Sequence, residues 1–261
     1  GLPGRMAVGH TRYSTTGSSV LKNSQPLVVT YAKGSLAVAH NGNLVNAFEL
    51  HRELEAAGSI FQTTVDSEII LHLLARATNK EFQDDLMECL RLLKGAFTLL
   101  FLTERELIGV RDPNGFRPLC IGRLNKAYVL ASETCALDII GAKFVREVEP
   151  GEVVILGPGG LRSMRPFKAQ ETARSHCLFE HVYFSRPDSI IFGENVHMVR
   201  KALGRELARE HPAKADIVIP VPDSGNSAAL GYSEESGIPL DVGIIRNHYV
   251  GRTFIQPAQG M

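Results

Sequence analysis

The sequence lacks a long apolar segment, a secretory leader and an excess of charge of either sign. No apolar run approaches the ~20 residues that a helix needs to cross a bilayer. The first residues contain no basic stretch followed by an apolar one, so we expect no signal peptide there. Lysine plus arginine and aspartate plus glutamate each number 28, which gives no general attraction to nucleic acid or an anionic membrane. We expect neither as a partner.

Cysteine is also scarce. The four cysteines (Cys89, Cys120, Cys135 and Cys177) are far apart and form no CxxC pair, which makes a disulfide scaffold improbable in a chain of this size. We therefore expect reduced thiols and a cytoplasmic protein. The sequence begins with glycine and not methionine, which indicates a processed N-terminus or a piece of a longer chain.

The composition is that of an ordinary globular protein. Hydrophobic residues make up 44% and charged residues 21% of the 261 residues, which suffices for a sizeable core. This length predicts two domains or one large one. Internal repeats and low-complexity tracts are absent from the sequence.

The first part of the chain reads as α+β. Residues 27–42 have the pattern of a β-hairpin, and helices are expected near 46–58, 66–77 and 81–93, with Asn46 and Asp66 as N-caps. Short β-rich runs punctuated by turn residues follow, from 96 to 156. Helices and strands in blocks favour packed α+β layers over a strict βαβ repeat.

A polar stretch at 157–176 predicts a domain boundary. We assign residues 1–165 to the first domain and 166–261 to a linker and the start of a second. Residues 194–210 predict a long helix. The runs 215–222 and 239–245, with a helix between them, predict a βαβ unit of a parallel sheet. That unit alone is not a complete domain.

Arg12 lies in "VGHTRYSTTG", among hydroxyl residues and between glycines. A guanidinium offers a planar fork that matches a carboxylate or phosphate, and the nearby hydroxyls can share the same anion. An ordinary surface arginine in a loop is the alternative interpretation.

Asn41 and Gly42 stand in "HNGN", at the end of an apolar strand. Asn-Gly is a common hairpin turn. The side-chain amide of such an asparagine and the next backbone N–H also form two adjacent donors, which can stabilise an oxyanion. Both interpretations stay open on the sequence alone.

Asp66 in "VDSE" stands where a helix is expected to begin. A carboxylate there serves as an N-cap. Its remaining lone pairs can bind a substrate ammonium group. Together, a cationic fork, an anion and an oxyanion hole describe a site for a free α-amino acid that undergoes acyl transfer. An activated nucleophile is not evident, because no cysteine stands near a candidate base.

The motifs "GHTRYSTTG", "AHNGN", "VDSE", "RDPNGFRPLCIG" and "ASETCALD" resemble the glutaminase domain of the amidophosphoribosyltransferase family, which belongs to the N-terminal-nucleophile class II glutamine amidotransferases. "FEHVYFSRPDS", "IPVPDSG" and "RNHYVGRTFIQP" resemble the same family's passage into a phosphoribosyltransferase domain. The resemblance covers essentially the whole chain in collinear order. It implies a four-layer αββα glutaminase fold, followed by the start of an α/β type I phosphoribosyltransferase domain.

The resemblance also implies roles for individual residues. Arg12 and Thr15 would bind the α-carboxylate of glutamine, and Asp66 its α-ammonium group. The side chain of Asn41 and the backbone N–H of Gly42 would form the oxyanion hole. The family's nucleophile is an N-terminal cysteine, and the sequence begins downstream of its place. As written, the chain is therefore expected to bind glutamine without hydrolysing it.

Further ligands are implied by the second part of the resemblance. The family binds PRPP with Mg²⁺, and Arg252 is a basic candidate for PRPP binding, with Arg246 as a second. "PDSGN" ahead of a helix could cradle phosphate, and a plain N-cap by Asp223 or Ser224 is the alternative. Cys177 matches a ligand of the [4Fe–4S] cluster found in one branch of the family. A single thiolate cannot hold such a cluster, and a buried thiol is the alternative.

The resemblance predicts amidophosphoribosyltransferase activity: transfer of glutamine-derived ammonia to PRPP, giving 5-phosphoribosylamine, glutamate and pyrophosphate, the first step of purine synthesis. It also implies nucleotide feedback inhibitors and a homo-oligomer. Two alternatives stay open. One is another class II amidotransferase, such as a hexose-phosphate aminating enzyme, and the other is a non-catalytic glutamine sensor.

Overall fold

The chain forms two compact units, Gly1–Leu178 and Phe179–Met261, each of which is described by itself. The computed structural model describes residues 4–11, 20–79, 81–168, 171–247 and 249. Arg12, Thr15 and Arg252 therefore lie outside the described residues. No helix in the described part of the chain is long and apolar enough to cross a membrane.

The centre of the first unit is a six-stranded antiparallel sheet with the order β1-β2-β3-β4-β8-β9. A 3₁₀ turn at Leu21–Asn23 precedes it. Its strands are β1 (Leu27–Tyr31), β2 (Gly34–Leu44), β3 (Gly95–Leu102), β4 (Leu107–Arg111), β8 (Val153–Gly157) and β9 (Gly160–Met164). The predicted hairpin at 27–42 is β1 and β2, and the predicted strand at 96–102 is β3.

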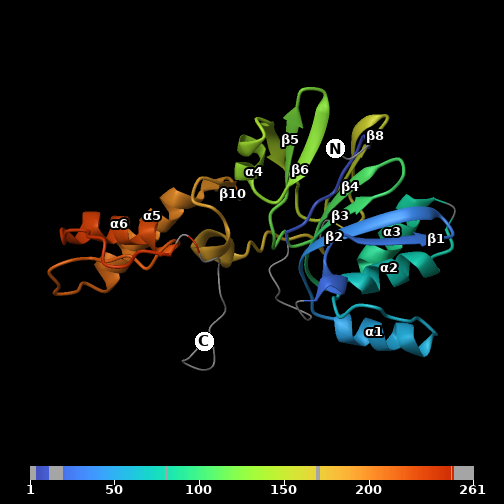
Figure 1. Cartoon of the computed structure of the whole chain (residues 1–261), viewed down its shortest axis with the longest axis horizontal. Coiled ribbons are helices and arrows are strands. Elements are labelled where there is room, and N and C mark those ends of the chain that lie inside the picture. Colours follow the sequence, from blue (N-terminus) through green and yellow to red (C-terminus); the bar gives the residue numbers. More distant parts are fainter. Residues whose placement is uncertain (1–3, 12–19, 80, 169–170, 248, 250–261) are drawn as a thin grey trace. The chain divides into compact units, whose positions relative to one another are not determined.

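Three helices cover one face of this sheet (Figure 1). They are α1 (Ala47–Ala56), α2 (Ser67–Arg76) and α3 (Phe82–Leu92). Side chains alternate across β3: Phe97, Leu99 and Phe101 pack in the core on the helix side, and Leu100 packs in a cluster on the other face. This alternation follows from the period of two along a strand and gives the sheet two buried faces.

A second sheet packs against the other face of the first. It has the order β6-β5-β7, with β5 (Cys120–Leu124), β6 (Ala127–Ala131) and β7 (Lys143–Glu147). Ile121 of β5 and Val154 of β8 belong to the cluster between the sheets. Gly109 of β4 faces the same layer, since a Cβ there would lie 2.7 Å from the side chain of Leu130.

The fourth layer is a short helix, α4 (Thr134–Ile139). Leu137 packs with Cys120 on the outer side of the second sheet. Helices, sheet, sheet and helix therefore follow one another, so the predicted α+β class and its four-layer αββα arrangement are confirmed. Helix α4 and strand β9 were absent from the sequence-based prediction.

Asn46 is at the predicted helix start, but the prediction that its side chain caps the helix is wrong. Asn46 stands at the N-cap position of α1, but its side chain makes no capping hydrogen bond. Its Nδ2 donates to the carbonyl of Leu92, and its Oδ1 accepts the N–H of Lys94, both 46 or more residues away. The carbonyl of Leu92 and the N–H of Lys94 lie where α3 ends, and there they need hydrogen-bond partners outside the helix. The side chain of Asn46 supplies both and so connects the end of β2 to the end of α3.

A loop of the first unit, residues 112–117, is held by buried charges at its start. The carboxylate of Asp112 is buried and accepts the N–H groups of Asn114 and Phe116. The side chain of Arg111 donates to the carbonyls of Gly115 and Arg117 at 2.9 Å each. The conformation of this loop is therefore fixed by the side chains of Arg111 and Asp112.

The segment 173–177 pairs with this loop through its main chain. The N–H groups of Ala173, Ser175 and Cys177 donate to carbonyls of Pro113, Asn114 and Phe116, at 3.0, 2.8 and 3.2 Å. Residues 166–178, which the sequence analysis places after the predicted boundary, are counted with the first compact unit. The boundary at 165/166 stays a prediction.

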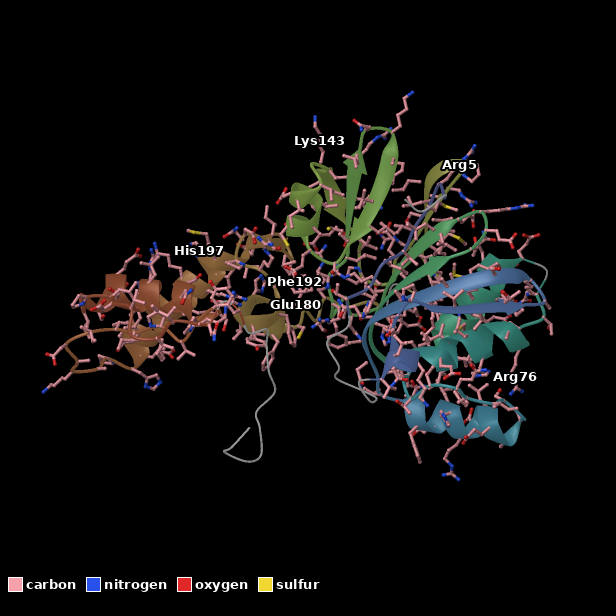
Figure 2. The ribbon with its side chains drawn as sticks, viewed as in Figure 1. Arg5, Arg76, Lys143, Glu180, Phe192 and His197 are labelled. Carbon is pink, nitrogen blue, oxygen red and sulfur yellow. The ribbon has the colours of Figure 1, made fainter. Side chains whose placement is uncertain are left out.

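The second unit contains two packed helices, α5 (Val196–Glu210) and α6 (Gly225–Ser236). A π-helical turn (Glu180–Phe184) and a small hairpin of β10 (Ile190–Ile191) and β11 (Glu194–Asn195) precede them. Figure 2 labels His197 at the beginning of α5; its Nδ1 lies 2.8 Å from the Oγ of Ser227 in α6. The predicted helices at 194–210 and within 223–237 are confirmed.

The prediction of two regular strands in the second unit is wrong. Val218 and Leu240 form one isolated parallel bridge, and the rest of 215–222 and 239–245 has no strand pairing among the described residues. Several apolar side chains here remain exposed, including Val221 at 69% and Ile245 at 75%. Extended apolar runs become strands only beside a partner that satisfies their N–H and C=O groups.

Close contact between α5 and α6 depends on glycine. A Cβ on Gly204 would lie 1.9 Å from the carbonyl oxygen of Ala228, and a Cβ on Gly231 would lie 1.9 Å from that of Lys201. Neither distance is possible for packed atoms, so a side chain at either position must push the helices apart.

We predict that Gly231→Ala destabilises the second unit by about 1–3 kcal/mol, the usual cost of overpacking. Gly225→Ala is a matched control in the same helix, because a Cβ there would meet its nearest neighbour at 3.9 Å. Limited proteolysis and circular dichroism would measure the effect. Equal behaviour of the two variants would contradict the predicted role of the close helix contact.

Candidate functional site

The end of β2 presents an open edge. Strand β1 pairs with residues 34–38 of β2, and beyond Val38 the described part of the chain provides only β3 as a strand partner, which leaves what we call the open edge. The N–H of His40 donates to Oε1 of Gln25 at 2.6 Å, and the N–H of Leu44 donates to Oδ2 of Asp66 at 2.9 Å. Because N–H directions alternate along a strand, the N–H of Gly42 points to the same edge, between these two.

Asp66 stands at the beginning of α2 but does not cap it. Its side chain makes no capping bond to the helix and instead reaches β2, 22 residues earlier in the chain. One oxygen accepts the N–H of Leu44, and the other lies 3.3 Å from Nδ1 of His40. The expected N-cap is therefore corrected: the carboxylate bridges the helix to the open strand edge.

The carboxylate of Asp66 is kept ionised. Its side chain is only 8% exposed, and burial raises its pKa. Hydrogen bonds from His40, Leu44 and Ser67, together with the charge of His40, outweigh burial and leave the pKa below its ordinary value. A buried anion of this kind can bind an ammonium group.

His40 links the parts of this edge. Its side chain is 1% exposed, and its Nδ1 lies 3.3 Å from both Oδ1 of Asp66 and Oγ of Ser67. The amide of Gln25, which accepts the N–H of His40, also donates to Oγ of Ser67 at 3.3 Å. Among the described residues, Nε2 of His40 has no hydrogen-bond partner.

Gly42 is required by the close approach of β3. A Cβ at this position would lie 2.0 Å from the carbonyl oxygen of Ala96 and 2.9 Å from Nε2 of His40. The backbone φ is +153°, a value that side chains rarely allow. With glycine at position 42, β2 can pair with β3 and still present the backbone N–H of Gly42 at the open edge.

The side chain of Asn41 leaves β2 on the opposite face from His40, as expected for neighbouring strand residues. Its Oδ1 accepts hydrogen bonds from Nε and Nη2 of Arg117, at 3.2 and 3.0 Å. The carbonyl end of this carboxamide is thus occupied, and Nδ2 has no hydrogen-bond partner in the described part of the chain.

These groups give one strand end a definite chemistry. Asn41 offers an amide donor and Gly42 a backbone donor, and Asp66 supplies an anion on the same edge as the Gly42 N–H. Two donors can stabilise an oxyanion, and the anion can bind an α-ammonium group. The predicted cationic part of the site, Arg12 with Thr15, lies outside the described residues.

The described cysteines do not supply a nucleophile to this strand end. Cys89 and Cys120 are buried, and burial raises the pKa of each thiol to about 12. Cys135 is also buried, and Cys177 is partly exposed. Thiols with such raised pKa values remain protonated near neutral pH and react poorly.

A metal centre is likewise not formed by the described side chains. Within that part of the chain, no group of three or more His, Cys, Asp or Glu residues could hold a metal ion. Cys177 is therefore not joined there by further thiolates. A [4Fe–4S] cluster needs four, so the described residues alone do not fit one.

The beginning of α6 lacks the side-chain N-cap expected from Asp223 or Ser224, and phosphate binding by "PDSGN" stays a prediction. Ser224 stands at the N-cap position but makes no side-chain capping bond. The carboxylate of Asp223 instead forms an ion pair with Arg246 at 2.9 Å. Both side chains are about half exposed, so the pair itself adds little stability.

Arg117, His40 and Ser67 are site residues that the sequence did not single out. Arg117 lies in the quoted motif "RDPNGFRPLCIG", but its partner Asn41 is 76 positions away. His40 stands in the quoted motif "AHNGN" and Ser67 in "VDSE", and these motifs were the signal that the sequence offered for them.

Comparisons with known proteins show what the chain is similar to. Residues 10–138 match a family described as a glutamine amidotransferase domain. The amidophosphoribosyltransferase of Rhizobium etli is 51% identical over 263 residues, which cover 99% of this chain and 53% of the relative. That of Bacillus subtilis strain 168 is 52% identical over 261 residues, covering 100% of this chain and 54% of the relative.

A solved structure is similar as well. Glutamine phosphoribosylpyrophosphate (PRPP) amidotransferase from B. subtilis, complexed with ADP and GMP, superposes with a TM-score of 0.88 at 52% identity. The match covers 96% of this chain and 54% of that protein. The chain thus spans about half the length of the curated relatives it matches.

We predict that acid weakens the wild-type protein more than Asp66→Asn. A lowered pKa means that this carboxylate stabilises the fold above the unfolded pKa of ~3.9, and that the stabilisation is lost as the pH falls through the folded value. The difference in the free energy of unfolding between the two proteins should therefore shrink from pH 6 towards pH 2.

Urea unfolding at several pH values measures this difference. Asp138→Asn, in the exposed end of α4, is a matched control and should track the wild type at every pH. A constant difference between wild type and Asp66→Asn would contradict the lowered pKa.

Proposed function

The chain belongs to the amidophosphoribosyltransferase family, and from this premise we propose that its first unit binds glutamine and releases ammonia from it. The observation that carries the proposal is the open edge of β2, where Asn41 and Gly42 supply two hydrogen-bond donors and the buried carboxylate of Asp66 accepts the N–H of Leu44, two residues after Gly42. Few other substrates need all three.

Asp66 is proposed to bind the α-ammonium group of glutamine. Its carboxylate is ionised and fixed by the N–H of Leu44 and by His40, so it is already oriented before substrate arrives. Such preorganisation lowers the cost of binding. Arg12 and Thr15 are proposed to bind the α-carboxylate, since a guanidinium fork matches its two oxygens.

Nδ2 of Asn41 and the N–H of Gly42 are proposed as the oxyanion hole. A thiolate adds to the carboxamide carbon of glutamine, and the electron pair of the C=O bond moves to oxygen as the tetrahedral intermediate forms. The two donors stabilise this negative charge. The C–N bond then breaks as the departing nitrogen takes up the proton that the thiol lost to the N-terminal α-amine, and ammonia leaves. Water hydrolyses the resulting thioester to glutamate and free thiol.

The thiolate in this scheme is assigned to an N-terminal cysteine outside the 261 residues, as in the family. The cysteines of the first unit do not suit that step. Cys89 and Cys120 are buried, with pKa values raised to about 12.

We propose that the complete protein transfers the ammonia to PRPP, giving 5-phosphoribosylamine and pyrophosphate. Ammonia must stay unprotonated and away from water between the two reactions, which favours two domains in one chain. Arg252 is the proposed PRPP-binding residue, and Mg²⁺ would neutralise the pyrophosphate leaving group when PRPP is bound. The hexose-phosphate alternative is not favoured, because the relatives match across both units.

Further ligands of the complete protein are proposals of the same kind. ADP and GMP in the B. subtilis relative support nucleotide regulation here. Cys177 would be one ligand of a [4Fe–4S] cluster only if the complete protein supplies three more thiolates. A homo-oligomer in the cytoplasm is the proposed assembly and location.

We predict that Asp66→Asn in the full-length protein raises the KM for glutamine at least tenfold. The amide keeps an oxygen for the N–H of Leu44 but loses the charge that the ammonium group needs. Phosphoribosylamine formation from free ammonia, measured on the same preparation, should be unchanged. Equal loss of both activities would count against a glutamine site, and Asp138→Asn is the matched control.

Asn41→Asp is expected to lower kcat for glutamine hydrolysis by about 10²–10³ or more, the cost of losing one oxyanion donor. The new carboxylate keeps the shape and the pairing with Arg117 but cannot donate, and its charge opposes the oxyanion. Ammonia release from glutamine measures the rate. Asn125→Asp, in the exposed turn between β5 and β6, is the control; unchanged kcat in Asn41→Asp would remove Asn41 from the oxyanion hole.

A further inference from the structure

The carboxamide of Asn41 can face a substrate with either of two ends of nearly the same shape. The nitrogen end donates hydrogen bonds, whereas the oxygen end only accepts them. An oxyanion is stabilised by the first and repelled by the second. A rotation of the carboxamide by about 180° would therefore abolish one donor without moving the backbone.

Arg117 distinguishes these two orientations. Its Nε lies 3.2 Å and its Nη2 lies 3.0 Å from Oδ1 of Asn41. A guanidinium carries hydrogen-bond donors and no acceptor, so the rotated carboxamide would set its NH₂ group against two N–H groups. The bonds to Oδ1 are also assisted by the positive charge, which makes them stronger than neutral ones.

We propose that Arg117 is a positioning residue that holds the Asn41 carboxamide with Nδ2 towards the substrate. The proposal rests on the function proposed above. Arg117 acts through Asn41, by orienting a donor, and not by a contact of its own with the reacting carbon.

The fold holds Arg117 in register with Asn41. Asn41, Thr98 and Arg111 are direct partners across β2, β3 and β4, so their side chains form one row on one face of the sheet. Oγ1 of Thr98 donates to the carbonyl of Arg117 at 3.3 Å, and Nε of Arg111 donates to the same oxygen at 2.9 Å. The main-chain carbonyl of Arg117 is thus held by the other two members of that row, Thr98 and Arg111.

The rest of the loop supports this placement. Arg111 is 1% exposed, and it also donates hydrogen bonds to the carbonyls of Gly115 and Val148. Asp112 is fully buried and accepts the N–H of Phe116, the residue before Arg117. A side chain that extends from so constrained a backbone loses little further freedom when it binds Asn41.

A double-mutant cycle in the full-length protein tests the proposal. The variants are Arg117→Ala, Asn41→Ala and the double variant, with Arg117→Lys as the conservative replacement. Arg123→Ala is the matched control, because Arg123 is exposed on β5 and bonds Asn125 and Tyr128. Glutamine hydrolysis and ammonia-dependent synthesis are measured for each.

Arg117→Ala should lower kcat for glutamine by about tenfold to a hundredfold, less than loss of the donor itself, with KM changed less than threefold. Arg117→Lys should recover part of this loss, since an ammonium group also accepts no hydrogen bond. In the Asn41→Ala background the same substitution should change kcat less than twofold, because the group it positions is already gone.

Two results on glutamine hydrolysis would overturn the proposal. One is an equal fall in kcat from Arg117→Ala in the wild-type and Asn41→Ala backgrounds, which would mean that Arg117 acts without Asn41. The other is an unchanged kcat in Arg117→Ala. A fall in ammonia-dependent synthesis to the same degree would also contradict it, because that reaction needs no oxyanion hole.

The side-chain amide signals of Asn41 give a test that needs no activity. In ¹⁵N-labelled protein, Arg117→Ala should shift or broaden the NH₂ pair of Asn41, and Arg123→Ala should leave it in place. An unchanged pair in Arg117→Ala would overturn the proposed orientation. If the wild type releases no ammonia from glutamine, the proposed function fails, and this measurement still decides the role of Arg117.

Discussion

The contact between Asp66 and the edge of β2 is the constraint on which the site depends. Strand β1 leaves its neighbour after Val38, and the N–H groups beyond that point need other partners. The carboxylate of Asp66 accepts one of them, from Leu44, and so joins the beginning of α2 to the sheet. The same carboxylate then serves as the anion of the proposed site. The open edge leaves the N–H of Leu44 in need of an acceptor, and the carboxylate of Asp66 that accepts it is also the anion proposed to bind substrate.

Much of the fold could be predicted from local patterns. The strands from 95 to 157 alternate between two buried faces, and this period of two is visible in the sequence. Asp66 and Asn46 were recognised as residues at helix starts for the same reason. Their actual bonds, to Leu44 and to Leu92 and Lys94, could not be foreseen, because each partner is more than 20 positions away.

The sequence predicted the residues proposed to contact the substrate, but it did not predict the residue that positions one of them. Asn41, Gly42 and Asp66 stand in short motifs whose chemistry is legible from residue type. Arg117 became visible only in the structure, where strand pairing sets Asn41, Thr98 and Arg111 in one row and the last two bond the carbonyl of Arg117. The predicted strands near 218 and 240 failed for a related reason, since apolar runs show that a segment seeks burial and say nothing of whether a neighbour is present.

The main-chain pairing of 173–177 with 113–116 has a consequence for variation along the chain. Every second N–H is used, and each bond is made by backbone and not by side chain. Most replacements in this segment therefore leave the pairing intact, although proline at a donating position removes its N–H. A change of length by one residue would turn the alternate N–H groups away from the loop. Residues 173–177 therefore tolerate most substitutions but not the insertion or deletion of a residue.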